Sequence, residues 1–288
     1  MAYACCQIQQ GVVFNFLIIS YIDALGVNVM KAMIFAAGLG TRLKPITDTL
    51  PKALVPIGGK PLLEHVARKL KASGIDEAVV NVHHFADMIE EWIHADAADG
   101  NGTGLSMQVS DEREQLLETG GGILKARPYL QDCGSFLIHN VDILSNLDID
   151  WFASQVKDDA VATLLVSGRE TVRYLLFDPQ TMRLVGWTNV KTGEVKSPYG
   201  DLNPEDCLKM AFSGIHIISD RVFDIMEDYV KEKGLHEDSY SPRFPIIDFY
   251  LSVCARYPVY GVPASDLRMI DVGKLDSLQQ AEQLAGNL

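Results

Sequence analysis

The sequence is poor in cysteine, in positive charge and in long apolar runs. Its five cysteines stand at positions 5, 6, 133, 207 and 254 and form no C-x-x-C pair. We therefore expect free thiols in a reducing cytoplasm, and neither a disulfide framework nor a zinc site. Lysine and arginine number 25 against 38 acidic residues, which gives a net charge of −13. This excess repels phosphate backbones and anionic membrane surfaces, so we predict neither nucleic acid nor a membrane as a partner.

The first segment also lacks positive charge. No Lys or Arg precedes Lys31, so the basic n-region of a signal peptide is missing. The apolar run from Val12 to Ile22 is interrupted by Asn15 and Ser20 and is too short to cross a bilayer. We expect residues 1–29 to be an extension outside the fold, for which a start codon assigned too early is one explanation.

From residue 31 onward, strand-like and helix-like segments alternate, which is typical of a mainly parallel sheet with crossover helices. We predict a single α/β domain over 31–285, with a small β-rich insertion at about 171–207 that contains a hairpin around Asp178. The expected strands are 31–37, 77–82, 105–110, one within 135–144 that ends before Asp142, 160–168, 210–219 and 268–272. The expected helices are 60–74, 86–99, 147–157, one from about 220, 245–255 and 274–286.

A glycine-containing loop, Ala36-Ala37-Gly38-Leu39-Gly40-Thr41-Arg42, follows the first predicted strand. Gly38 and Gly40 allow a sharp turn and a close backbone approach to a ligand. Successive N–H groups in such a turn form a concave anion site, to which Arg42 adds a bidentate fork and Lys52 a mobile charge. The loop matches neither the phosphate-loop pattern nor the dinucleotide fingerprint. Taken alone, it fits a structural turn as well as an anion site.

Three further segments carry candidate site residues. The glycines of Leu117-Glu118-Thr119-Gly120-Gly121-Gly122 form a flat backbone surface on which a planar base could lie, or else a permissive helix start. Asp142 and Asp271 each follow an apolar strand, at the end where open α/β sheets bind ligands. Two such carboxylates suit a Mg²⁺ ion that is completed by substrate phosphates, although an aspartate in this position is often only a turn or cap residue.

The stretch "FAAGLGTRLKPITDTLPKALVPIGGKPLLEH" resembles the signature of the sugar-1-phosphate nucleotidyltransferases, A-x-G-x-G-T-R-L-x-P-x-T followed by P-K-x-L-x-P-[VI]. The resemblance continues in order through most of residues 31–285. It implies a Rossmann-like (GT-A-like) three-layer fold. It also implies a magnesium-dependent reaction in which a nucleoside triphosphate and a sugar 1-phosphate give a nucleotide sugar and pyrophosphate.

The resemblance also assigns residues to roles. It implies catalytic roles for Arg42, Lys52, Asp142 and Asp271, and metal binding by the two aspartates. It implies nucleotide contacts by Ala36, Ala37, Gly38, Gly40, Thr41, Asn81, Glu118, Thr119, Gly120 and Gly121. The segment "FSGI" matches the family's F-x-G-I, which borders the sugar, and so implies contacts by Ser213 and Gly214. The family's Glu-Lys-Pro segment, whose lysine contacts the sugar phosphate, is absent, and we assign that role to Arg173 or to Arg169. Trp187 is a candidate neighbour of the sugar.

The L-E-T-G-G-G form is most similar to the bacterial uridylyltransferase branch that recycles muramic acid, which implies UTP and N-acetylmuramic acid 1-phosphate. Alternatives remain open: GTP with mannose 1-phosphate or another hexose phosphate, or a catalytically silent regulatory protein that binds nucleotide sugars. A related glycosyltransferase would need a D-x-D metal motif. Asp148-Ile149-Asp150 spells one, but we place it at a helix start. Whether the chain forms homo-oligomers is left open by the sequence.

Overall fold

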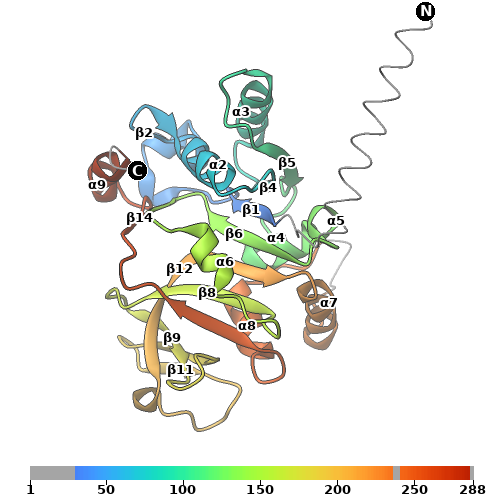
Figure 1. Ribbon diagram of the computed structural model, residues 1–288, viewed down its shortest axis with the longest axis vertical. Helices are drawn as coiled ribbons and strands as arrows, with labels where there is room; N and C mark the ends of the chain where they lie inside the picture. The colour runs from blue at the N-terminus through green and yellow to red at the C-terminus, as the bar shows by residue number, and fades with distance from the viewer. Residues whose placement is uncertain (1–29, 236–240, 286–288) are drawn as a thin grey trace, which may run out of the picture.

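The computed structural model describes residues 30–235 and 241–285, and the expectation for residues 1–29 therefore lies outside the described residues. Within the described part, a ten-stranded sheet has the order β11-β10-β9-β12-β6-β1-β4-β5 along its main path. In addition, β8 pairs with β12, and β13 pairs with β8. Helices cover both faces of this sheet (Figure 1). The predicted α/β three-layer fold is confirmed.

The elements have the following bounds. The strands of the large sheet are β1 (Lys31–Phe35), β4 (Glu77–Val82), β5 (Ser106–Asp111), β6 (Ser135–Asn140), β8 (Ala162–Ser167), β9 (Arg173–Phe177), β10 (Leu184–Asn189), β11 (Glu194–Lys196), β12 (Leu208–Ser219) and β13 (Val259–Pro263). Two short pairs are β2 (Pro56–Ile57) with β3 (Lys60–Pro61), and β7 (Ile143–Ser145) with β14 (Met269–Asp271). The α-helices are α2 (Leu62–Ala72), α3 (Ala86–Ala98), α4 (Glu118–Lys125), α5 (Arg127–Leu130), α6 (Ile149–Ser154), α7 (Val222–Lys233), α8 (Ile246–Val253) and α9 (Leu275–Ala285).

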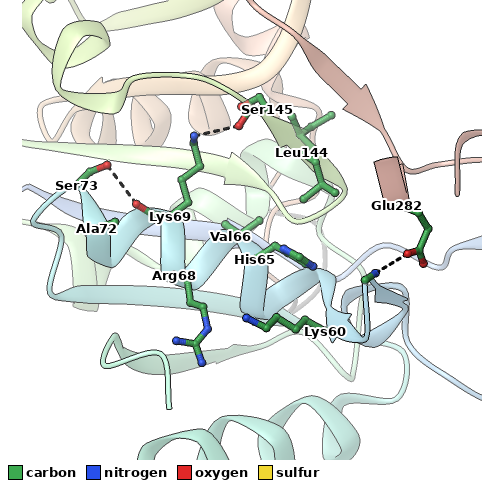
Figure 2. A pocket seen from close by; sticks show the side chains of 12 residues that line it. Lys60, His65, Val66, Arg68, Lys69, Ala72, Ser73, Leu144, Ser145 and Glu282 are labelled. Atoms are coloured by element: carbon green, nitrogen blue, oxygen red, sulfur yellow. Dashed lines mark hydrogen bonds between the residues drawn. The ribbon is translucent and has the colours of Figure 1, made fainter. Parts of the chain in front are cut away.

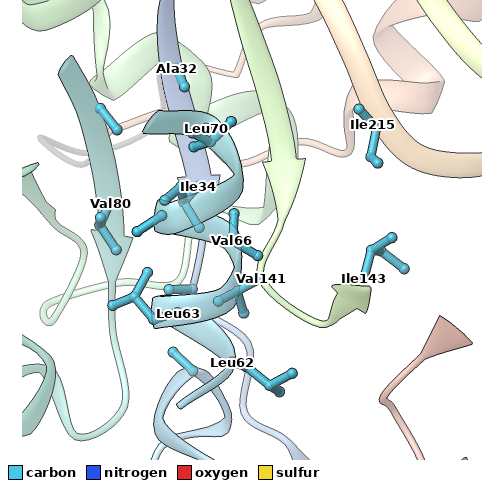
Figure 3. Close-up of a cluster of buried hydrophobic side chains, with 14 of the residues drawn as sticks. Ala32, Ile34, Leu62, Leu63, Val66, Leu70, Val80, Val141, Ile143 and Ile215 are labelled. Carbon is cyan, nitrogen blue, oxygen red and sulfur yellow. The ribbon is translucent and has the colours of Figure 1, made fainter. Parts of the chain in front are cut away.

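Strand β1 is apolar on both faces because it lies between two layers of helices. It runs parallel to β4 on one side and to β6 on the other. Ile34 packs against Leu63, Val66 and neighbouring side chains under α2 (Figure 3). Met33 points to the opposite face, into the core that α4, α5, α7 and α8 cover. Burial on both sides explains the continuous apolar run that predicted this strand.

The β-rich segment extends the same sheet. Strand β12 is antiparallel to β6 over its second half, and its first residues pair with β9. Strands β9 and β10 form the hairpin predicted around Asp178, and β11 pairs with β10 at the edge. A register shift in the pairing of β12 with β8, between Phe212 and His216, marks the point where β12 leaves the parallel half of the sheet. Strands β9 to β11 therefore stand directly beside the carboxyl ends of the parallel strands.

The strand predicted within 135–144, ahead of Asp142, is β6, which ends at Asn140. The chain turns at Val141, whose N–H donates to the Phe35 carbonyl at 3.1 Å and whose side chain is buried. Residues Ile143–Ser145 then form β7, which pairs with β14 and not with the large sheet. The turn places Asp142 at the end of β6 with its side chain beside the loop after β1. Among the helices that the structure describes, none is long and apolar enough to cross a membrane.

Candidate active site

A pocket of about 410 Å³ opens at the carboxyl ends of β1, β4 and β6, where open α/β sheets bind ligands. Eight residues predicted from the sequence line it: Ala36, Ala37, Gly38, Lys52, Asn81, Glu118, Thr119 and Asp142. Phe35, Glu112, Leu116, Asn140 and Val141 complete the lining. The pocket has a size that suits a nucleoside.

The glycine loop forms one wall of this pocket. Gly40 has a φ of +63°, and a Cβ there would lie 2.8 Å from Thr47 Cγ2, so a larger residue would be strained and crowded. The Thr47 hydroxyl and the Leu43 N–H both donate to the Gly40 carbonyl at 2.8 Å, which fixes the turn. A Cβ at Gly38 would meet no atom within 4 Å. Internal packing therefore does not require glycine at position 38, which lines the pocket.

The two aspartates lie next to each other across the β7–β14 pair. Asp271 stands opposite Ile143 in the register, and the Val272 N–H donates to the Asp142 carbonyl at 2.8 Å. Burial and the negative charge of Asp142 raise the pKa of Asp271. The short β ribbon thus brings together two carboxylates that are distant in the sequence.

Three cations face these carboxylates. Lys52 is almost fully buried and forms an ion pair with Asp142. The charges of Lys52, Arg42 and Arg169 each lower the pKa of Asp271 and partly offset its rise. A Cβ at Gly273 would lie 2.7 Å from Arg42 Nη2 and 2.5 Å from Asp271 Oδ1, so only glycine lets these two groups approach.

The chemistry of this donor set fits a hard divalent cation. Two carboxylates close enough to repel each other gain from a shared positive charge, as the raised pKa of Asp271 indicates. Within the described residues no group of three or more His, Cys, Asp or Glu side chains could hold a metal. A cation bound here would therefore take its remaining ligands from water or from a phosphorylated substrate, as Mg²⁺ commonly does.

A buried glutamate that sequence reasoning missed holds the nucleotide side of the pocket. Glu112 accepts from Asn81 Nδ2 at 2.8 Å and from the Leu117 N–H at 3.1 Å. Asn81 Oδ1 in turn accepts from the N–H groups of Ala36 and Ala37, at 2.8 and 3.3 Å. Burial raises the pKa of Glu112, and the hydrogen bonds from Asn81 and Leu117 lower it in part. Glu112 directly follows β5, so the strand-end rule that found Asp142 could have found it too.

Asn81 therefore stabilises the start of the glycine loop through hydrogen bonds from the Ala36 and Ala37 N–H groups. Its amide oxygen and nitrogen both bond to protein groups, and the residue is almost fully buried. A contact between Asn81 and a nucleotide stays a prediction.

The L-E-T-G-G-G segment is a helix start, the second of the two alternatives that the sequence left open. Helix α4 begins at Glu118, so Gly120 and Gly121 lie in its first turn. A Cβ at Gly120 would lie 2.3 Å from the Phe244 ring, and one at Gly121 would lie 2.2 Å from the Pro242 carbonyl oxygen. These glycines pack against residues 242–244, which the local sequence could not reveal. Glu118 and Thr119 line the pocket, and Gly120 and Gly121 do not.

The Gly120→Ala variant should lower the free energy of unfolding by about 1–3 kcal/mol, because the added methyl group would overlap the Phe244 ring in a tightly packed region. Urea unfolding followed by circular dichroism measures this change. Gly100→Ala is the matched control, since a Cβ there meets no atom within 4 Å. Equal stability of the two variants would contradict the packing role.

The residues predicted to contact the sugar and its phosphate have different surroundings in the structure. Ser213 is buried and its hydroxyl donates to the Leu165 carbonyl at 2.7 Å, so this group is used inside the sheet. Gly214 has a φ of +77°, and a Cβ there would lie 2.6 Å from Asn140 Nδ2. Arg169 donates to the Phe212 carbonyl at 3.1 Å and affects the pKa of Asp271, whereas Arg173 is not among the charges that do so. Of the two candidate arginines, Arg169 is the one beside the acid pair.

A larger cavity, of about 690 Å³, contains none of the predicted site residues. It lies between α2 and β7 (Figure 2), and two of its basic side chains already have partners. Lys69 donates to the Ser145 carbonyl at 3.1 Å, and Arg68 pairs with Glu64 at 2.8 Å. The smaller pocket therefore remains the candidate active site.

The chain resembles known proteins over this same region. A family model described as Nucleotidyl transferase matches residues 31–174. An N-acetylmuramate alpha-1-phosphate uridylyltransferase of Caulobacter vibrioides is 47% identical over 111 residues, which are 38% of this chain and 45% of that protein. The protein of the same description from Neisseria meningitidis serogroup B is 41% identical over 119 residues, 41% of this chain and 49% of that protein.

The matched segment thus spans about half the length of these curated relatives. Among solved structures, a UDP-glucose pyrophosphorylase complexed with UDP-glucose superposes with a TM-score of 0.68 at 15% identity. The superposition covers 90% of this chain and 99% of that one. At this identity the likeness concerns the fold, and it extends over nearly the whole of both chains.

Proposed function

Because the chain belongs to the nucleotidyl transferase family, we propose that it transfers a nucleotidyl group from a nucleoside triphosphate to a sugar 1-phosphate. The observation that carries this proposal is the meeting of Arg42 and Lys52 with Asp142 and Asp271 beside a nucleoside-sized pocket. A silent regulatory relative could lose any of these four side chains without consequence. Their joint presence in one place favours an active enzyme.

The reaction proceeds by in-line displacement. An oxygen of the sugar phosphate attacks the α-phosphorus, the bond from that phosphorus to the bridging β-oxygen breaks, and its electron pair leaves with pyrophosphate. No side chain needs to remove a proton, since a phosphate monoester is mostly dianionic at pH 7. The barrier lies in bringing two anions together, so positioning and fixed charge supply the catalysis. Arg42 and Lys52 supply that charge, and the backbone of residues 36–40 positions the nucleotide.

Asp142 and Asp271 are the residues that would hold Mg²⁺ in this scheme. When bound, the ion supplies positive charge that offsets the repulsion between the two phosphorylated substrates. Lys52, which forms an ion pair with Asp142, adds a fixed positive charge beside this site.

For the substrates we favour UTP and N-acetylmuramic acid 1-phosphate. The support is the L-E-T-G-G-G form of residues 117–122 and the description of the two relatives that are 41–47% identical. Glu118 and Thr119 of this segment line the pocket. This position suits recognition of the base.

A panel of four nucleoside triphosphates against several sugar 1-phosphates tests the proposal, with pyrophosphate release as the readout. We expect UTP with N-acetylmuramic acid 1-phosphate to give the highest kcat/KM, and chelation of the divalent cation to abolish turnover. A higher rank for GTP than for UTP would refute the substrate assignment. Absence of pyrophosphate release with every pair would refute the enzymatic function.

A further inference from the structure

We propose that a second pocket, lined by Arg169 and Arg173, binds an acidic substituent of the acceptor sugar through Arg173, so that the enzyme prefers sugar 1-phosphates that carry a carboxylate on a substituent of the ring. This inference rests on the proposed function and assigns the acceptor class to the same site. The pocket has a volume of about 610 Å³ and lies between strands β9–β11 and helix α8.

The sheet forms the floor of this pocket. Residues that are paired across neighbouring strands point to the same face, and here two such rows face the cavity. One row consists of Arg173, Asn189 and Glu194, and the other of Leu175, Trp187 and Lys196. Trp187 thus offers an apolar face with polar groups around it, a combination that suits a sugar ring.

Helix α8 forms the opposite wall, through Asp248 and Leu251 among others. The first helical N–H of α8, that of Ile246, donates to the Thr119 hydroxyl at 2.9 Å. Thr119 also lines the nucleotide pocket. The wall of the second pocket is therefore fixed by a residue of the first.

Arg169 and Phe212 connect the second pocket to the reacting groups. Both residues line it, and Arg169 donates to the Phe212 carbonyl at 3.1 Å. Phe212 precedes Ser213 and Gly214, and Gly214 abuts Asn140 of the nucleotide pocket. A sugar whose phosphate lies between Arg169 and Asp271 would extend its ring toward Trp187 and Arg173.

The charges in the pocket single out Arg173. Lys196 pairs with Asp248 at 3.6 Å and with Glu194 at 4.0 Å, and its ammonium lies 5.3 Å from the centre of the Trp187 ring. The guanidinium of Arg173 forms no ion pair or hydrogen bond with another group in the described parts of the chain. In a chain with a net charge of −13, an unpaired arginine in a pocket points to an anionic ligand. Since Arg42, Lys52 and Arg169 already surround the reaction centre, Arg173 is available for a second anion.

Two acceptors that differ in one group test this assignment. N-acetylmuramic acid 1-phosphate equals N-acetylglucosamine 1-phosphate plus a lactyl ether, which carries the carboxylate. We expect the unaltered enzyme to have the higher kcat/KM for the acidic acceptor. In Arg173→Gln the ratio of the two values should fall by about 10- to 100-fold, the effect of one charge-assisted hydrogen bond. Arg173→Lys should retain part of the preference, and Lys191→Gln, an exposed lysine outside the pocket, should leave the ratio unchanged.

The possible failures differ from one another. An equal fall for both acceptors in Arg173→Gln would mean that Arg173 binds the phosphate, and it would overturn the inference while leaving the transferase function intact. An unaltered enzyme without preference for the acidic acceptor would overturn it in the same way. Absence of transfer to either acceptor from any nucleoside triphosphate would overturn both the inference and the proposed function.

Discussion

The Lys52→Ala variant is expected to release pyrophosphate at least about 100-fold more slowly than the unaltered chain, which is the effect of removing one preorganised charged group from an active site. Lys52 is almost fully buried and meets Asp142, so its charge acts in surroundings where water screens it poorly. The same loss is expected for Asp142→Ala. Initial rates of pyrophosphate release at saturating substrates measure both.

The effects of Lys52→Ala and Asp142→Ala on the rate of pyrophosphate release should not be additive. Lys52 and Asp142 act on the same reacting phosphates, so the double variant should be about as slow as the slower single variant. Lys60→Ala is the control, because Lys60 lies in the same segment, is exposed and does not line the nucleotide pocket. Circular dichroism checks that each variant is folded, since Asp142→Ala leaves a buried ammonium without its partner. Near-normal turnover of both single variants would refute the proposed mechanism.

The four charged residues of this mechanism were accessible from the sequence because each belongs to a local pattern. Arg42 and Lys52 lie in one long motif after the first strand, and Asp142 and Asp271 end strands whose apolar runs are plain. Parallel strands bring their carboxyl ends to one edge of a sheet, which places Asp142 beside the loop after β1. Asp271 reaches the same place by another route, because β14 pairs antiparallel with β7 outside the large sheet. The structure brings these four together: the charges of the other three all act on Asp271.

What the sequence did not predict depends on partners that are remote in the chain. Gly120 and Gly121 look like a loop, and only the Phe244 ring and the Pro242 carbonyl show why a helix needs glycine there. The pairing of Ile143–Ser145 with β14, outside the large sheet, is equally hidden in the sequence. A local sequence pattern cannot reveal such contacts, because the same residues are compatible with both a loop and a helix, or with both a longer strand and a separate strand pair.

The choice between Arg169 and Arg173 was open for a related reason. Both follow the same strand, β8, and either could face the sugar phosphate from sequence alone. The register of β9 with β10 pairs Arg173 with Asn189, on the face that also carries Trp187, while the charge of Arg169 acts on Asp271. Pairing register is a property of the whole sheet, so it separates the surroundings of two arginines where composition and spacing cannot.

The Asn81→Leu variant should lose at least about 2 kcal/mol of unfolding free energy and about 100-fold in kcat/KM. A leucine of similar size would leave the N–H groups of Ala36 and Ala37 without an acceptor and Glu112 without a donor, all in a buried place. The loop that positions the nucleotide would then rest on apolar contact alone. Asn101→Leu is the matched control, since Asn101 is exposed in a surface turn and should change neither quantity appreciably.

Stability and kinetics together decide what Asn81 does. Urea unfolding and steady-state rates of the same preparation give both numbers. A support role predicts that stability and kcat fall together, because the loop is misplaced whether or not nucleotide is bound. A direct contact to the base predicts a raised KM for the nucleoside triphosphate with stability unchanged. The second result would contradict the support role and would restore Asn81 to the nucleotide contacts that the motif implies, whereas the two hydrogen bonds from Ala36 and Ala37 to its amide oxygen favour the first.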